Sequence, residues 1–141
     1  MINKIIEYFR SKATLTGIEL DKVKKALPKI DRKILNPARH FVLDTKYKSC
    51  SLTDMQKILF KDLTNFKLSG KYYDCDNYAF RLSAKVKSKY PSLSFGVVLS
   101  TSHAFNIFID KYGKVWYIEP QTDKIFSKLT KEYKPILLII L

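Results

Sequence analysis

The spacing of apolar residues predicts helices in the first part of the chain. In four segments, apolar side chains recur every three or four positions, which is typical of amphipathic helices. These segments are residues 2–12, 18–27, 51–63 and 74–90. Pro28 and Pro91 follow two of them and would end the helices there. The pattern between residues 28 and 50 is irregular, with room for one short helix.

The second part of the chain has the short β-branched and aromatic runs that are typical of strands. These runs are residues 94–100, 103–109, 114–120 and 135–140. The sequence DKYGK at 110–114 predicts a turn, in which Gly113 can take a positive φ. Helices followed by strands predict an α+β fold, with helices of the N-terminal half packed on a C-terminal antiparallel sheet. A length of 141 residues fits a single domain.

The chain is strongly basic, with a formal net charge of +13. This charge fits either a polyanionic partner, such as nucleic acid or an anionic membrane, or a lysine-rich solubilising surface. We favour the solubilising surface because arginine, which binds phosphates and base edges through two parallel hydrogen bonds, is scarce. The lysines are also spread along the chain. Nucleic acid stays an alternative partner that no sequence motif supports.

The termini and the cysteines bear on the cellular compartment. The N-terminal sequence MINKIIEYFRSK has charges inside its apolar pattern and therefore lacks a signal-peptide core. The run ILLIIL at 136–141 is much shorter than the about 20 apolar residues that span a bilayer. Cys50 and Cys75 are the only cysteines, so no disulfide framework is implied. We expect a reduced, cytoplasmic protein with no transmembrane segment.

The segment YYDCDNYAF at 72–80 places Cys75 in the first turn of a predicted helix. Free cysteine is often only a small core residue. At a helix N-terminus, however, backbone N–H groups and the helix dipole stabilise a thiolate. Asp74 or Asp76 can cap this helix, although their negative charge opposes a thiolate. The position of Cys75 therefore favours a nucleophile, at an electrostatic cost.

His103 and Glu119 are the downstream residues that can assist a thiol. His103 begins a predicted strand, whereas the other histidine, His40, lies in the irregular segment. If Ile109 faces Val115 across the turn, Glu119 lies on the same sheet face as His103 and diagonally next to it. A turn with one residue more or fewer would put Glu119 on the opposite face. The spacing thus permits a His–Glu pair.

Together these residues suggest thiol-based acyl chemistry. Cys75 would attack an acyl carbon, His103 would transfer the proton, and Glu119 would fix the imidazole tautomer. The Cys75 backbone N–H would hold the oxyanion together with a second donor. Gln121 and Asn106 are the polar candidates for that donor, although Asn106 falls on the other sheet face from His103.

A metal site is the competing interpretation of the same residues. No CxxC or HxxxH spacing occurs, which argues against structural zinc. A hard cation could be bound by Asp74, Asp76 and Glu119. No cofactor is required by the sequence.

Three segments in order carry a resemblance to a known family. YDCDNYAF, HAFNIFID and WYIEPQTDKIF resemble the papain-like cysteine peptidase domain of the Marasmius oreades agglutinin group, and small bacterial and viral proteins carry similar stretches. The resemblance covers about residues 45–127. It implies a papain-like or transglutaminase-like core and a catalytic triad of Cys75, His103 and Glu119. It also implies calcium-dependent proteolysis, with Asp74 and Asp76 as ligands.

The resemblance is incomplete. The sugar-binding β-trefoil of the agglutinin has no counterpart in these residues, and the papain signature CGSCW is missing. Residues 1–44 match nothing in the family and are expected to form a helical extension on a 45–141 core. The sequence thus predicts a cysteine hydrolase or acyl transferase, most simply a peptidase acting on peptides or proteins. A non-catalytic binding module, including one for nucleic acid, and a phage or viral structural protein are the alternatives.

Overall fold

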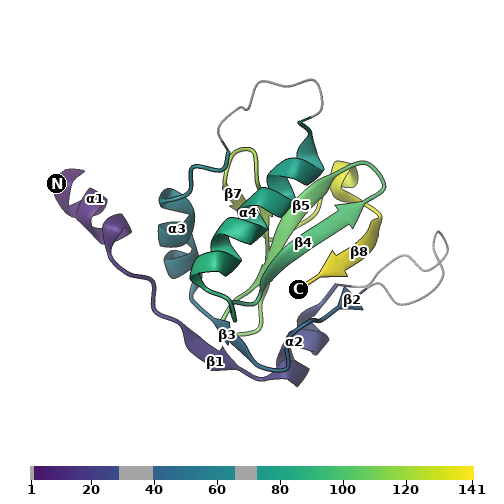
Figure 1. The fold of residues 1–141 in the computed structure, drawn as a ribbon, viewed down its shortest axis with the longest axis horizontal. Coiled ribbons are helices and arrows are strands. Elements are labelled where there is room, and N and C mark those ends of the chain that lie inside the picture. Colours follow the sequence, from purple (N-terminus) through teal and green to yellow (C-terminus); the bar gives the residue numbers. More distant parts are fainter. Residues whose placement is uncertain (1, 29–39, 66–72) are drawn as a thin grey trace.

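The structure is a computed structural model that describes residues 2–28, 40–65 and 73–141, and it shows an α+β fold (Figure 1). Its helices are α1 (Ile2–Arg10), α2 (Leu20–Ala26), α3 (Leu52–Phe60), α4 (Cys75–Lys89) and the 3₁₀ helix η1 (Lys131–Tyr133). Its strands are β1 (Thr16–Ile18), β2 (His40–Phe41), β3 (Tyr47–Ser49), β4 (Phe95–Ser100), β5 (Ala104–Ile109), β6 (Val115–Glu119), β7 (Lys124–Phe126) and β8 (Ile136–Ile140). Among these residues, no helix is long and apolar enough to cross a membrane.

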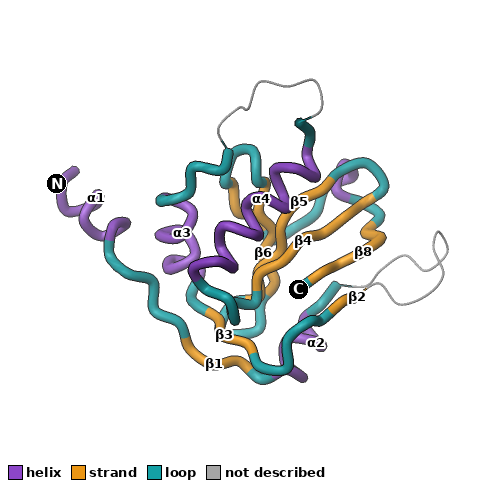
Figure 2. Tube along the Cα trace, viewed as in Figure 1, coloured by secondary structure: helices purple, strands orange, loops and turns teal. Residues whose placement is uncertain are grey.

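The main sheet has the strand order β2-β8-β4-β5-β6-β7 (Figure 2). Its neighbouring strands are antiparallel, apart from the parallel pair β2–β8 at one edge. Strands β1 and β3 form a separate two-stranded antiparallel sheet. The predicted α+β class is therefore confirmed, with a sheet that is mainly rather than wholly antiparallel.

Each face of the main sheet is covered by a different part of the chain. Helix α4 packs across one face, where its Leu82 and Val86 join a cluster with Phe108 of β5. The opposite face carries Phe105 and Ile107 of β5, which cluster with residues that include Val23 of α2. This alternation along β5 is the period of two that a strand buried on both faces requires. The same alternation determines which face of the sheet the side chain of each site residue points to.

The structure differs from the predicted elements mainly where strands are very short. The helix predicted over 18–27 begins at Leu20, because Ile18 pairs with Tyr47 between β1 and β3. Part of the predicted irregular segment, residues 29–39, lies outside the described residues. The rest of that segment contributes β2 and β3. Strands of two or three residues are too short to show an alternating pattern.

The N-terminal residues, predicted as a helical extension, contact the rest of the chain in two ways. Helix α1 has no buried residue and lies against α3, where Phe9 stacks on Phe60 with ring centroids 5.4 Å apart. Ile18 and Val23, in contrast, are buried in the same cluster as the sheet residues. The domain boundary at residue 44 stays a prediction.

Candidate active site

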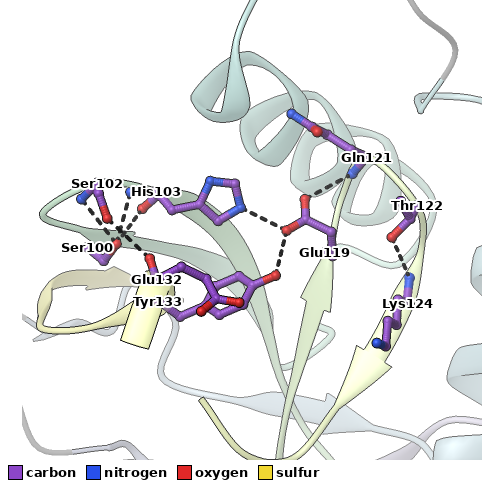
Figure 3. A network of polar contacts seen from close by, with 9 residues as sticks. All are labelled: Ser100, Ser102, His103, Glu119, Gln121, Thr122, Lys124, Glu132 and Tyr133. Carbon is purple, nitrogen blue, oxygen red and sulfur yellow. Dashed lines mark hydrogen bonds and ion pairs between the residues drawn. The ribbon is translucent and has the colours of Figure 1, made fainter. Parts of the chain in front are cut away.

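His103 and Glu119 meet at one end of the β5–β6 hairpin (Figure 3). Nε2 of His103 lies 2.8 Å from Oε2 of Glu119. An ionised carboxylate can only accept hydrogen bonds, so Nε2 carries the proton and Nδ1 is the nitrogen left to act as a base. The side chains of His103 and Glu119 expose only 21% and 13% of their surface. Their interaction is therefore less screened by water than a surface pair would be.

A turn held by Asp110 sets the geometry of this hairpin. Asp110 is buried, and its Oδ1 accepts hydrogen bonds from the backbone N–H groups of Tyr112 and Lys114, each at 2.9 Å. Its Oδ2 accepts a hydrogen bond from Nε1 of Trp116, also at 2.9 Å. Gly113 supplies the positive φ of 84° that the turn needs. One carboxylate thus closes the turn and ties it to the following strand.

The turn fixes the register that brings His103 and Glu119 together. Ile109 pairs with Val115, the register under which His103 and Glu119 were expected to share a face. Strand residues alternate between faces, so this register directs His103 and Glu119 to the same face of the sheet. A shift by one residue would have separated them.

A second turn holds the backbone of His103 where β5 begins. Oγ of Ser100 accepts a hydrogen bond from the His103 N–H at 3.0 Å, and the Ser100 N–H donates to the His103 carbonyl at 2.8 Å. Small hydroxyl residues form such local hydrogen bonds readily. The sequence STS before His103 therefore contributes a rigid support for the imidazole.

Tyr133 is also part of this site, and no sequence pattern predicted it. Its hydroxyl donates a hydrogen bond of 2.9 Å to Oε2 of Glu119, and its ring centroid lies 5.2 Å from that of His103. Burial, followed by the hydrogen bond to Glu119, raises the pKa of Tyr133 to about 12, so the phenol stays protonated and donates. Tyr133 lies in the polar segment TKEYKP, outside every predicted element. The one feature of the sequence that could have pointed to Tyr133 as a site residue is an aromatic side chain among polar neighbours.

Cys75 lies at the same end of the sheet but on the face covered by α4. It is half-buried and packs against a small cluster of Ala79, Val97 and Ala104. Because Ala104 directly follows His103, this contact brings the N-terminus of α4 to the β4–β5 turn, as Figure 1 also shows. Among the described residues, no hydrogen bond joins the Cys75 sulfur to His103. The structure thus brings the thiol and the His–Glu pair to one region without direct contact.

Helix α4 begins with a capping box formed by Asp74 and Asn77. The side-chain oxygen of Asn77 accepts a hydrogen bond from the Asp74 N–H at 3.0 Å, while the Asp74 side chain receives the backbone N–H of Asn77. A hydrogen bond with the Asp76 side chain raises the pKa of Asp74. Asp74 therefore caps the helix that presents Cys75, which was one of the predicted roles.

The described residues do not assemble a calcium site by themselves. Within residues 2–28, 40–65 and 73–141, no three His, Cys, Asp or Glu side chains gather to hold a metal ion. Calcium takes about six to eight oxygen ligands, and Asp74 with Asp76 supply only part of such a set. Calcium binding by Asp74 and Asp76 stays a prediction, and no chemical step below depends on it.

The two candidate oxyanion donors differ in placement. Gln121 is exposed, and its backbone N–H donates to Oε1 of Glu119 at 3.3 Å. Asn106 is fully buried, and its Nδ2 donates to the carbonyls of Ala79 and Gly96 at 2.9 and 3.0 Å. One hydrogen bond of the Asn106 amide thus ties α4 to the sheet and the other joins β5 to β4, on the face away from His103.

Comparison with known proteins supports the fold assignment. No protein-family model and no curated protein matches the chain. The structure is similar to that of the PSL1a–E64 complex, with a TM-score of 0.69, 17% sequence identity and 89% of this chain covered. It is also similar to Polyporus squamosus lectin bound to the human-type influenza-binding epitope Neu5Aca2-6Galb1-4GlcNAc, with a TM-score of 0.63, 18% identity and 90% covered.

This similarity concerns part of each lectin chain. The chain spans about half the length of the structures it matches, 51% and 49% respectively. At such low sequence identity, the likeness establishes the fold alone. It confirms, at the level of the fold, the resemblance to the agglutinin group: the chain has the papain-like fold that occurs in these fungal lectins.

Proposed function

We propose that this protein is a cysteine hydrolase, most simply a peptidase, with Cys75 as its nucleophile. The observation that carries this proposal is the hydrogen-bonded His103–Glu119 pair, which lies at the end of the sheet where α4 brings Cys75. The papain-like fold supports it. The matching PSL1a structure is a complex with E64, a cysteine protease inhibitor, which also supports thiol chemistry on this fold.

The reaction would proceed through a covalent acyl intermediate. Cys75 transfers its thiol proton to Nδ1 of His103, and the sulfur attacks the acyl carbon of a peptide bond. The amine then leaves with the proton from His103. Water next gives a proton to His103 and attacks the thioester. The carboxylic acid is released, and His103 returns the proton to the departing Cys75 sulfur, which restores the free thiol. Glu119 accepts the Nε2–H bond throughout and stabilises the imidazolium.

The developing oxyanion would be held at the N-terminus of α4. The backbone N–H of Cys75 lies in the first turn of the helix, where N–H groups lack partners within the helix. The helix dipole favours negative charge at this end. We propose Gln121 as the second donor because it is exposed and lies two residues after the end of β6 at Glu119.

Differential labelling of the two cysteines tests this proposal. Cys50 is fully buried, and burial raises its pKa to about 12, so it serves as an internal reference for an unreactive thiol. At pH 6, iodoacetamide should modify Cys75 at least about 10-fold faster than Cys50. His103→Ala should slow the modification of Cys75 by about 10²-fold. Mass spectrometry of the two cysteine peptides gives both rates.

A second arm uses E64 as the probe. The intact protein and Cys50→Ala should each gain one E64 adduct, whereas Cys75→Ala should gain none. Slow and equal alkylation of both cysteines, with no E64 adduct, would contradict the proposal. Peptide cleavage with and without an added amine then separates hydrolysis from acyl transfer, because a transferase yields the amide of that amine.

The positive net charge supports a second candidate, a binding module for nucleic acid. The chain carries 26 lysine and arginine residues against 13 acidic ones. Binding that depends on this charge would weaken steeply with added salt. It would also be unchanged in Cys75→Ala. Salt-sensitive binding of DNA or RNA, combined with an inert Cys75, would therefore favour this candidate over the hydrolase.

A further inference from the structure

One carboxylate oxygen of Glu119 has two hydrogen-bond donors. Oε2 accepts the Nε2–H of His103 at 2.8 Å and the hydroxyl of Tyr133 at 2.9 Å. Within the described part of the chain, the other oxygen, Oε1, accepts only a longer hydrogen bond of 3.3 Å from the Gln121 backbone. Among the described residues, two groups other than His103 therefore donate hydrogen bonds to the Glu119 carboxylate. The hydrogen bond from the Tyr133 hydroxyl is the shorter one.

The ring of Tyr133 is itself held in place by other aromatic rings. Its centroid lies 5.0 Å from that of Phe105 and 4.9 Å from that of Phe126. It also makes an edge contact with His103. Packing on several sides leaves the hydroxyl little freedom, so it can act as a fixed donor.

The segment around Tyr133 also contacts the turn that precedes His103 (Figure 3). Oγ of Ser102 donates to the carbonyl of Glu132 at 3.2 Å, and the N–H of Thr101 donates to the carbonyl of Pro135 at 3.3 Å. The same stretch of chain therefore supports His103 through its turn and Glu119 through the Tyr133 hydroxyl.

We propose that Tyr133 is a positioning residue whose hydroxyl holds the Glu119 carboxylate against Nε2 of His103. Its effect on catalysis rests on the proposed function, whereas its effect on the His–Glu hydrogen bond does not. With the carboxylate fixed, the imidazole keeps one tautomer and one orientation. Nδ1 then stays available to the thiol.

The test compares Tyr133→Phe with a matched control, Tyr117→Phe. Tyr117 belongs to the same aromatic cluster, with its ring 5.8 Å from that of Phe105. Its hydroxyl makes no hydrogen bond to any residue that the structure describes. Each variant removes one hydroxyl and keeps the ring. Melting temperatures of both variants show whether either change disturbs the fold.

The first readout is the proton on Nε2 of His103, observed by NMR. Its resonance is identified by its loss in His103→Ala. In Tyr133→Phe this proton should exchange with water at least about 10-fold faster than in the unmodified protein, because a hydrogen bond to a charged group is lost. In Tyr117→Phe the exchange rate should be unchanged. Equal exchange in the two variants would overturn the proposal.

The second readout is the pH profile of Cys75 alkylation. Tyr133→Phe should lower the rate at pH 6 by about 10-fold and move the midpoint of the profile to higher pH, since the imidazolium loses support. In a Glu119→Gln background, Tyr133→Phe should have no further effect, because Tyr133 acts through Glu119. If the double variant instead loses rate by the product of the two single-variant losses, Tyr133 acts independently of Glu119 and the proposal is contradicted.

The two readouts separate this inference from the proposed function. If Cys75 is inert but the Nε2 proton depends on Tyr133, the hydrolase proposal fails and the inference stands. If Cys75 is reactive but Tyr133→Phe behaves like Tyr117→Phe in both readouts, the inference fails and the hydrolase proposal stands.

Discussion

At the scale of single residues, Asp123 combines a left-handed backbone with a partly buried carboxyl group. Its φ is 58°, a conformation that aspartate and asparagine tolerate better than most residues. Its Oδ2 accepts a hydrogen bond of 3.0 Å from Asn65, while its buried Oδ1 has no partner among the described residues. Burial, followed by the charge of Asp62, raises the pKa of Asp123 from 3.8 to about 7.

We predict that Asp123 makes stability depend on pH. Because its pKa is raised on folding, the proton on Asp123 contributes stability that is fully present below pH 3.8 and is lost as the pH rises through about 7. Asp123→Asn should remove this slope and stabilise the protein at pH 7.5 by about 1 kcal/mol, after allowance for solvent screening of a partly exposed group. Urea unfolding between pH 4 and 8 measures the effect. An unchanged slope in Asp123→Asn would contradict it.

The sequence allowed part of the site to be found at this scale. His103 and Glu119 could be paired because a strand alternates with a period of two and Gly113 marked the turn between them. Cys75 could be placed at a helix start from the spacing of the apolar residues that follow it. Tyr133 could not be found, because it reaches Glu119 from η1, which has no pattern of its own and is positioned by tertiary contacts.

At the scale of elements, the pairing of β4 with β8 leaves no room for a side chain at Gly96. A Cβ there would overlap the carbonyl oxygen of Ile140 and lie 2.9 Å from Cα of Leu141. Both contacts are with backbone atoms of the neighbouring chain segment, which cannot move without disturbing the sheet. Gly17 in β1 offers the opposite case, since a Cβ there would meet nothing within 4 Å.

We predict that Gly96→Ala destabilises the protein by about 3 kcal/mol, the upper range for forcing extra atoms into a packed region. Gly17→Ala is the matched control and should change the free energy of unfolding by less than about 0.5 kcal/mol. Urea unfolding followed by circular dichroism gives both values. If the two substitutions cost the same, β8 does not pack on β4 as described.

The long elements were predictable and the short ones were not. Helix α3 lies within the predicted segment 51–63 and is capped by Ser51, whose Oγ accepts the Asp54 N–H at 3.1 Å. The strands β4, β5, β6 and β8 likewise match the predicted runs. Strand β2 has only two residues and is defined by its parallel partner β8. A contact with such a distant segment leaves no local trace in the sequence.

At the scale of the whole molecule, the N-terminal residues differ in how much they contribute to the core. Helix α1 has no buried residue, although Nζ of Lys61 donates to the carbonyls of Arg10 and Ser11 at 2.7 and 3.0 Å. Val23 of α2, in contrast, is completely buried against the sheet. The fold class was predictable from the order of the elements, whereas this long-range packing was not.

We predict that deletion of residues 1–12 lowers the melting temperature by only a few degrees, because exposed contacts contribute little. Val23→Ala should cost about 2 kcal/mol, since it opens a cavity in the core. Thermal unfolding of both variants measures the difference. A larger loss on deletion than in Val23→Ala would show that α1 supports the fold.

The hydrogen bond between Trp116 and Asp110 has a practical consequence. Trp116 is the only tryptophan in the chain, and it lies in the strand that ends at Glu119. Its fluorescence therefore comes from the hairpin that carries His103 and Glu119, and it should respond when the Asp110 turn opens. The protein thus contains its own optical reporter, which can time the opening of this hairpin separately from the melting of the helices.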